Sequence, residues 1–196
     1  MKQLSFIFLI FFLCSSKGFS QFSFGLEGGL TYTDIIMLSH PDNVVDEIDG
    51  KFAYQLGAYT ILPINSFGLK TGIYYSNRGG KDDTGLSDNS ILNLHYLGVP
   101  IMFRAQVVNK IHIEIGPEFN YLLSAKVSGE TVQSPEYKDF DFGANIGLFY
   151  SILKNSTIGL KFYRGFTDVI KIKDDPFPNI RYVNQGLGLS ITHLIL

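Results

Sequence analysis

The stretch NLHYLGVPIMFRAQVVNKIHIEIGPEFNYLLS, from Asn93 to Ser124, decides the fold, because it reads as two long strands folded back on one short turn. On its second half, apolar residues alternate with polar residues or glycine, and this period of two is sustained for longer than an average strand. The apolar members are Ile111, Ile113, Ile115, Phe119, Tyr121 and Leu123. A strand of roughly 12 residues tilted by about 40° spans roughly 30 Å, which matches a bilayer core. This stretch predicts a transmembrane β-barrel.

The start of the chain has the pattern of a secretory signal peptide. A basic start with Lys2 precedes an uninterrupted apolar run, Leu4 to Leu13, and a small polar segment, Ser15 to Ser20. We predict a cleaved signal peptide over residues 1–20 and an outer-membrane β-barrel domain over residues 21–196, with cleavage after Gln21 as the alternative. The single cysteine lies inside the leader, so the predicted mature chain needs no disulfide.

Charge and hydropathy exclude several protein classes. The 16 basic residues include Lys2 and Lys17, so 14 remain in the predicted mature chain against 18 acidic residues. This mild acidity argues against nucleic acid as a partner, which would require a basic stripe. No apolar run approaches the roughly 20 residues that a transmembrane helix needs.

Eight segments with the same period-two alternation follow one another, and each is rich in β-branched, aromatic and glycine residues. The predicted strands are Phe22 to Thr33, Lys51 to Leu62, Phe67 to Asn77, Leu92 to Val107, Lys110 to Lys126, Lys138 to Leu153, Ser156 to Asp168, and Arg181 to Ile195. We therefore predict an all-β fold, an eight-stranded antiparallel up-and-down transmembrane β-barrel.

The connections between these segments alternate in length. The short ones comprise residues 63–66, 108–109 and 154–155, and the long polar ones comprise residues 34–50, 78–91, 127–137 and 169–180. Outer-membrane barrels have short periplasmic turns and longer external loops. The alternation therefore predicts the cell outer membrane of a Gram-negative bacterium as the location.

Period-two alternation alone does not say which face of the strands is inside. A soluble eight-stranded barrel would place the aromatic face inside, around a small ligand. Eight strands enclose just enough room for side chains, and the many aromatic residues of this face, such as Phe52, Tyr54 and Phe140, would overfill it. The other face is rich in glycine. We therefore expect the aromatic face to contact lipid.

The inward face then carries polar residues from nearly every strand. They are Glu27, Gln55, Lys70, Arg104, Glu114, Glu118, Asn120, Asp141, Asn145 and Lys161. Four acids and three bases nearly balance, and charges in a confined interior survive by pairing. We expect an ion-pair ladder that fills the lumen. A selectivity filter or proton path is the alternative.

The fourth predicted strand is ambiguous in register. Leu92, Leu94 and Tyr96 favour even positions outward, whereas Leu97 and Val99 favour odd positions. A bulge near Gly98-Val99-Pro100 would reconcile the two patterns, because proline is tolerated at bulges.

The same segment carries a resemblance to a known family. The run Tyr96-Leu97-Gly98-Val99-Pro100-Ile101-Met102-Phe103-Arg104 resembles the aromatic-Leu-Glu-Ile-Pro-Leu strand motif of the small PorT-like outer-membrane beta-barrel family, also described as outer membrane protein beta-barrel, porin-family-like. Later runs that resemble strands of this family are Ile115 to Leu123, Phe140 to Gly143, and Gly165 to Asp168. The resemblance implies an eight-stranded outer-membrane barrel, and most members have no defined activity. Gly98 departs from the motif, which often has Glu there.

Motifs for catalysis or cofactor binding are missing from the sequence. There is no Walker loop, Gly-x-Gly-x-x-Gly, Gly-x-Ser-x-Gly or His-Glu-x-x-His motif. His95 and His112 could approach each other across the hairpin near Glu114, but a packed histidine is the commoner outcome than a metal ligand. We expect no cofactor, no metal and no enzymatic activity.

These observations give a first functional hypothesis and two alternatives. We expect a non-enzymatic outer-membrane barrel with a filled lumen, acting as a membrane scaffold or as an interaction and assembly component. The alternatives are a narrow porin-like channel for ions or small solutes and, less favoured, a barrel enzyme acting on lipid or peptide. Expected partners are outer-membrane lipid and, as a second class, other envelope proteins. The loop run Asp175-Pro176-Phe177-Pro178 is a candidate docking segment, because it presents an aromatic residue between two prolines.

Overall fold

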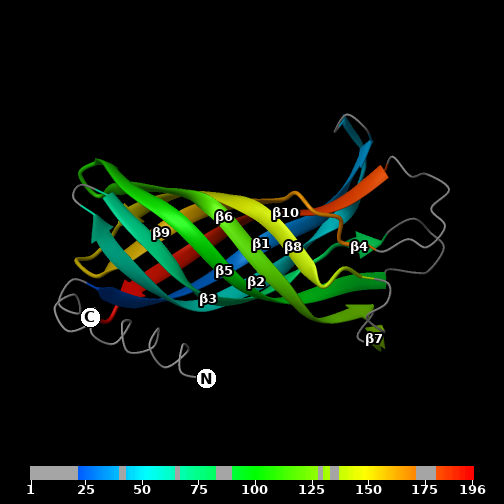
Figure 1. Ribbon diagram of the computed structural model, residues 1–196, viewed down its shortest axis with the longest axis horizontal. Coiled ribbons are helices and arrows are strands. Elements are labelled where there is room, and N and C mark those ends of the chain that lie inside the picture. Colours follow the sequence, from blue (N-terminus) through cyan, green and yellow to red (C-terminus); the bar gives the residue numbers. More distant parts are fainter. Residues whose placement is uncertain are drawn as a thin grey trace, which may run out of the picture.

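The computed structural model describes residues 22–39, 43–64, 67–82, 90–127, 130–132, 137–170 and 180–196, and it shows a closed barrel of antiparallel strands (Figure 1). Eight long strands form the wall: β1 (Ser23–Ser39), β2 (Asn43–Ile64), β3 (Phe67–Arg78), β5 (Ser90–Val108), β6 (Ile111–Val127), β8 (Phe140–Ser151), β9 (Ser156–Gly165) and β10 (Ile180–Leu194). Two short strands, β4 (Lys81–Asp82) and β7 (Glu130–Val132), extend the sheet beyond the wall. The predicted eight-stranded antiparallel fold is confirmed.

The barrel closes because β1 pairs with β10 as well as with β2. Register pairs followed once around the wall from Ile64 of β2 return to β2 at Tyr54, ten residues away. In an eight-stranded barrel, a stagger of this size corresponds to a strand tilt of roughly 40 to 45°. Residues at one height of the lumen therefore lie at progressively shifted positions on successive strands.

The two ends of the barrel differ as the connection lengths predict. The β2–β3, β5–β6 and β8–β9 connections are short and lie at one end, together with the start of β1 and the end of β10 (Figure 1). We call this the short-turn end and the opposite one the long-connection end. Short turns face the periplasm in outer-membrane barrels. At the β5–β6 turn, Lys110 has a φ of 69°, in the left-handed region that favours glycine.

The outer face of the wall is apolar, as expected for contact with lipid. Phe52 is 84% exposed and Phe140 66% exposed, and Leu, Ile and Val side chains fill the positions between the aromatic ones. Toward the long-connection end, ring contacts join Tyr32 with Phe52, Tyr54 with Tyr75, Phe119 with Phe142, Tyr121 with Phe140, and Phe142 with Phe166. Such aromatic girdles lie at the interface between lipid and water in outer-membrane barrels.

Inside the wall, glycine residues make room for a few large rings. A Cβ atom on Gly25 would lie 2.5 Å from the Tyr59 ring, and one on Gly57 would overlap the Tyr74 ring. Gly159 faces Phe149 in the same way. Part of the inward glycine set predicted from the sequence therefore has a packing reason: Gly25, Gly57 and Gly159 each accommodate a ring from a neighbouring strand.

Two sequence-based expectations about the strands are wrong. First, β1 extends to Ser39 and β2 begins at Asn43, so most of residues 34–50 prolongs a hairpin, where the sequence suggested a loop. Second, β5 alternates without interruption through Pro100, and the register shift lies at His95 and Tyr96. The extra residue is on β6, and Tyr96 points inward in phase with Gly98 and Pro100, where an outward position was predicted.

Candidate functional site

The lumen near the short-turn end is organised around the carboxylate of Glu27. Lys70 Nζ lies 2.8 Å from Glu27 Oε2 and 2.9 Å from Glu114 Oε2, so one ammonium bridges two carboxylates. Lys161 Nζ contacts the other oxygen of Glu27 at 2.7 Å, and Tyr74 Oη donates to Glu27 at 3.0 Å. Lys70, Glu27 and Glu114 are each at least 98% buried. Buried charges of this kind persist when they are paired and hydrogen-bonded.

Two further residues of the predicted lumen set complete this lower cluster. Gln55 Nε2 donates to Glu27 Oε1 at 3.1 Å, and Arg104 Nη1 lies 3.4 Å from Glu114 Oε1. Glu27 thus accepts hydrogen bonds on both oxygens, whereas Glu114 has a hydrogen bond on Oε2 and an ion pair at Oε1.

Aromatic rings pack around the cations of the lower cluster. Lys70 Nζ lies 4.5 Å from the centroid of the Tyr59 ring and 5.0 Å from that of Phe149. Lys161 Nζ lies 5.4 Å from the centroid of the Tyr74 ring. Strands β9 and β3 stand opposite each other in the wall, so this last contact crosses the lumen. The rings add a favourable cation–π interaction where water is excluded.

Nearer the long-connection end, an upper cluster surrounds Arg78. Its guanidinium pairs with Glu118 and lies 3.4 Å from Asp141 Oδ2. Asn145 donates to the second oxygen of Glu118, and Tyr163 Oη donates to Asp141 Oδ2 at 3.0 Å. The guanidinium carbon lies 3.7 Å from the centroid of the Tyr163 ring. Strands β3, β6, β8 and β9 are thereby joined through one arginine.

Amide side chains extend the upper cluster to β5 and β10. Asn184 Nδ2 on β10 lies 2.9 Å from Asp141 Oδ2 and 3.3 Å from Tyr96 Oη. Asn120 Nδ2 donates to Tyr163 Oη at 3.3 Å. All ten residues of the predicted lumen set therefore point inward, and the structure divides them between two clusters.

Sequence reasoning missed Arg78, which it assigned to the connection after the third strand. Strand β3 continues in phase through this position, so that Lys70, Tyr74 and Arg78 all face inward. The alternation of Ser76, Asn77 and Arg78 was the available signal. With Arg78 included, the lumen described by the structure holds four acidic and four basic side chains in contact with one another.

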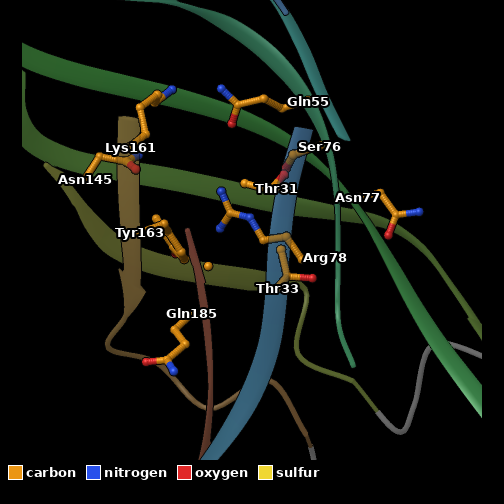
Figure 2. Close-up of a pocket in the computed structure, with 11 residues that line it drawn as sticks. Thr31, Thr33, Gln55, Ser76, Asn77, Arg78, Asn145, Lys161, Tyr163 and Gln185 are labelled. Carbon is orange, nitrogen blue, oxygen red and sulfur yellow. The ribbon is translucent and has the colours of Figure 1, made fainter. Parts of the chain in front are cut away.

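A small cavity remains between the two clusters, and Arg78 points into it (Figure 2). Its walls include Thr31, Gln55, Asn145, Lys161, Tyr163 and Gln185. It has room for about one or two water molecules. This cavity therefore has space for solvent and not for a larger ligand.

An apolar cluster lies beyond Arg78, toward the long-connection end of the barrel. Its buried members are Ile35, Leu94, Tyr96, Leu122, Ala125, Tyr137 and Val169. Tyr137 and Val169 come from the long connections, which meet through a bridge between Tyr137 and Ile170 and a backbone hydrogen bond from Lys138 N to Val169 O. The described ends of these two connections thus meet at the apolar cluster.

The other residues singled out in the sequence do not add a second site. His112 lies beside the β5–β6 turn, opposite Gln106, whereas His95 lies at the far end of the same hairpin, opposite Ser124. Among the described residues, no group of three His, Cys, Asp or Glu side chains could hold a metal ion. The candidate docking run Asp175-Pro176-Phe177-Pro178 and the predicted signal peptide lie outside the described residues.

Solved structures with this architecture include several outer-membrane proteins. Neisserial surface protein A aligns with a TM-score of 0.58 and 11% identity, over 87% of this chain and 96% of that one. OprG from Pseudomonas aeruginosa aligns at 0.47 and 9%, over 88% and 95%, and Ail from Yersinia pestis at 0.44 and 12%, over 86% and 98%. The first of these similarities supports the fold. No curated protein sequence matches this chain significantly.

The solved structures support only the fold, whereas a family model assigns the chain to a family. No helix among the described residues is long and apolar enough to cross a membrane. A family model described as "Outer membrane protein beta-barrel domain" matches residues 15–171, which is most of the chain. The protein is thus located in the outer membrane, where it crosses the bilayer with its strands. This chain belongs to the outer membrane protein beta-barrel domain family.

Proposed function

We propose that this protein is a non-enzymatic outer-membrane barrel whose lumen is closed and which acts through its membrane-anchored surface, as a scaffold or as an interaction and assembly component. The observation that best supports this proposal is that four acidic side chains contact four basic side chains in the lumen. A conducting pore needs a continuous hydrated path with weak, successive binding sites. Because these charges pair with one another, they leave no free site of the kind that would bind an entering ion.

Two contacts across the whole width of the lumen support a closed barrel. Arg78 stacks on Tyr163 in the upper cluster, and Lys161 lies over Tyr74 in the lower one. Each pair joins β3 to β9, which stand on opposite walls. An ion passing along the axis would have to separate both pairs and then displace the apolar cluster at the mouth.

Planar-bilayer conductance of the purified protein tests this proposal against a narrow channel. We expect no stable openings from wild-type protein whose insertion is verified by its resistance to added protease. Reproducible unit conductance from the wild type would contradict a closed lumen and favour the channel. The double variant Arg78→Ser/Tyr163→Ala, in which the upper crossing contact is removed, serves as the matched comparison and should conduct more than the wild type.

The enzymatic alternative is tested separately, by a substitution at the one serine–histidine hydrogen bond found among the described residues. Ser156 Oγ and His193 Nδ1 are 2.9 Å apart near the short-turn end, and no described carboxylate hydrogen-bonds to His193. A serine nucleophile requires a base that a third group orients. We expect Ser156→Ala to leave any phenotype of the protein unchanged. Loss of the phenotype in a folded Ser156→Ala protein would revive the enzymatic alternative.

A further inference from the structure

The two ends of the barrel differ in charge as well as in the length of their connections. The short connections, residues 65–66, 109–110 and 152–155, contain no aspartate or glutamate, and they include Lys110 and Lys154. Both lysines are exposed. The long connections, residues 40–42, 79–89, 128–139 and 166–179, each contain at least one acidic residue and together hold more acidic than basic residues. The short-turn end, which faces the periplasm, therefore carries the basic connections.

Two adjacent turns bring the lysines of the short-turn end to one side of the barrel. Lys110 lies in the β5–β6 turn and Lys154 in the β8–β9 turn. Strands β6 and β8 pair next to both turns, where Ile111 is opposite Tyr150. Ser151 N donates to Lys110 O at 2.8 Å, so the backbones beside the two turns are in contact. Two exposed ammonium groups are therefore carried by neighbouring parts of the periplasmic mouth.

Arg104 lies just inside this mouth, on the inner face of the β5–β6 hairpin. It is opposite Glu114 on β6 and Gly68 on β3, and Gly68 has no side chain that could accept a hydrogen bond. The guanidinium lies 3.4 Å from Glu114 Oε1 and makes no hydrogen bond to any described residue. The Arg104 side chain is 14% exposed. Its ion pair with Glu114 therefore leaves N–H donors for an acceptor that approaches from the mouth.

The next pair of residues toward the turn adds two further polar side chains. Gln106 is opposite His112, and the Gln106 side chain is exposed. His112 Nδ1 is buried and has no hydrogen-bond partner among the described residues. Arg104 and Glu114 both act electrostatically on His112, which places the ring close to them. We name Arg104, Gln106, Lys110, His112 and Lys154 the periplasmic basic site.

The charge balance of the lumen has the same direction as that of the connections. The lower cluster, near the short-turn end, contains three bases and two acids, namely Lys70, Arg104, Lys161, Glu27 and Glu114. The upper cluster contains one base and two acids. The positive surplus of the lower cluster and the two turn lysines add up, and the short connections contain no acidic side chain that would offset them. An anion that approaches from the periplasm therefore meets a positive field.

The chemistry of the site identifies the class of partner. A guanidinium donates two parallel hydrogen bonds to a carboxylate, and exposed ammonium groups pair with further carboxylates nearby. One arginine beside lysines from two turns thus fits several carboxylates in succession, as in a segment rich in aspartate and glutamate. We propose that the periplasmic basic site docks an acidic segment of a periplasmic protein, with one carboxylate on Arg104 and others on Lys110 and Lys154. This inference rests on the proposed interaction and assembly function, and it names the partner class and the end of the barrel that the partner contacts.

Fluorescence anisotropy tests this site with the protein in phosphatidylcholine nanodiscs, which leave both ends of the barrel accessible. The probes are a labelled hexaglutamate peptide and, for comparison, hexaglutamine. The test variants are Lys110→Gln/Lys154→Gln, at the exposed turn positions, and Arg104→Gln. The matched control is Lys81→Gln/Lys126→Gln, which removes two lysines toward the long-connection end. Folding of each variant is checked by its resistance to unfolding in cold SDS, and the turn variant alone decides if Arg104→Gln does not fold.

We expect the wild type and the control to bind hexaglutamate and not hexaglutamine. The turn variant should bind roughly threefold to tenfold more weakly, as the loss of two exposed ion pairs implies. Arg104→Gln should bind roughly tenfold to a hundredfold more weakly, as the loss of hydrogen bonds between charged groups implies. Equal binding by the wild type and the turn variant would overturn the proposal, as would an equal loss in the control. Binding of isolated peptidoglycan without binding of hexaglutamate would assign the site to the cell wall and also overturn it.

The outcome is separate from that of the conductance test. A wild type that neither conducts nor binds hexaglutamate would refute the docking site and leave the closed lumen standing. A wild type that conducts and still binds hexaglutamate through the turn lysines would refute the closed lumen and support the docking site.

Discussion

Arg78 and Tyr163 stack across the full width of the lumen, with the guanidinium carbon 3.7 Å from the centroid of the ring. The two residues come from β3 and β9, on opposite walls. Because Arg78 also pairs with Glu118 and Asp141, it contacts side chains from three other strands of the barrel. This geometry makes Arg78 the residue on which the upper half of the lumen depends.

Replacement of Arg78 by methionine should strongly destabilise the barrel. The change leaves the buried carboxylates of Glu118 and Asp141 without their cation, and breaking a buried pair in this way costs about 3 to 5 kcal/mol. The measurement is the free energy of unfolding in urea, in detergent micelles. Arg78→Lys retains the charge and should lose less. A loss below about 1 kcal/mol for Arg78→Met would show that the ion pairs do not hold this region together.

Lys70 and Glu114 should show strong energetic coupling. Lys70→Met leaves two buried carboxylates short of a cation, while Glu114→Gln removes one of them. The double variant should therefore lose less stability than the sum of the single variants, by about 1 to 3 kcal/mol. Lys161→Met provides the comparison, since Glu27 keeps Lys70 in that variant and the loss should be smaller. Strict additivity in the cycle of unfolding free energies would refute the coupling.

A side chain at position 98 would crowd the lumen. A Cβ at this position would overlap Asn120 Oδ1 and lie 3.4 Å from Glu118 Oε1. Gly98→Ala should lower the free energy of unfolding by about 1 to 3 kcal/mol. Gly98→Glu, which introduces the residue often found in the PorT-like strand motif, should lower it further, because it adds a fifth carboxylate to a balanced lumen.

Gly68→Ala is the control for this prediction, since the closest atom to its new Cβ is a methyl carbon of Ile61 at 3.1 Å and the next ones lie 3.8 Å away. We expect a smaller loss there, and equal losses at the two positions would argue that crowding at Gly98 is unimportant.

The β5–β6 turn should respond to substitution at Lys110. Its φ of 69° is unfavourable for most side chains, so Lys110→Gly should raise the stability by about 0.5 to 1 kcal/mol. Lys110→Val should lower it, because a β-branched side chain tolerates this conformation least. The unfolding midpoint in urea distinguishes the two changes, and a shift in the same direction for both would contradict the assignment of this backbone conformation.

Most of the fold could be predicted from the sequence, because its signals are local. All eight predicted strands are present, and seven of them begin within two residues of the predicted start. The short connections were also found. The errors fell where local patterns compete, as on β5, where Leu94 and Tyr96 look like lipid-facing residues but form part of the apolar cluster at the mouth.

The sequence predicted which residues line the lumen, but it did not predict which of them contact one another. The alternation placed Glu27, Lys70 and Glu114 on the inner face, yet it could not say that one ammonium bridges both carboxylates. Arg78 was missed because the Gly79-Gly80 pair that follows it resembles the start of a loop. Lys51 was placed on a strand, but its contacts with Asn77 and Asn93 depend on three different strands.

The sequence by itself determined the number of strands, the lipid-facing side of every strand except β5, and which end of the barrel carries the short turns, since the period of two and the connection lengths are properties of neighbouring residues. Only the tertiary structure decided which charges meet. Lys161 pairs with Glu27 across 134 positions of sequence. That contact follows from the ten-residue stagger that accumulates around the closed wall and sets the height of every inward side chain.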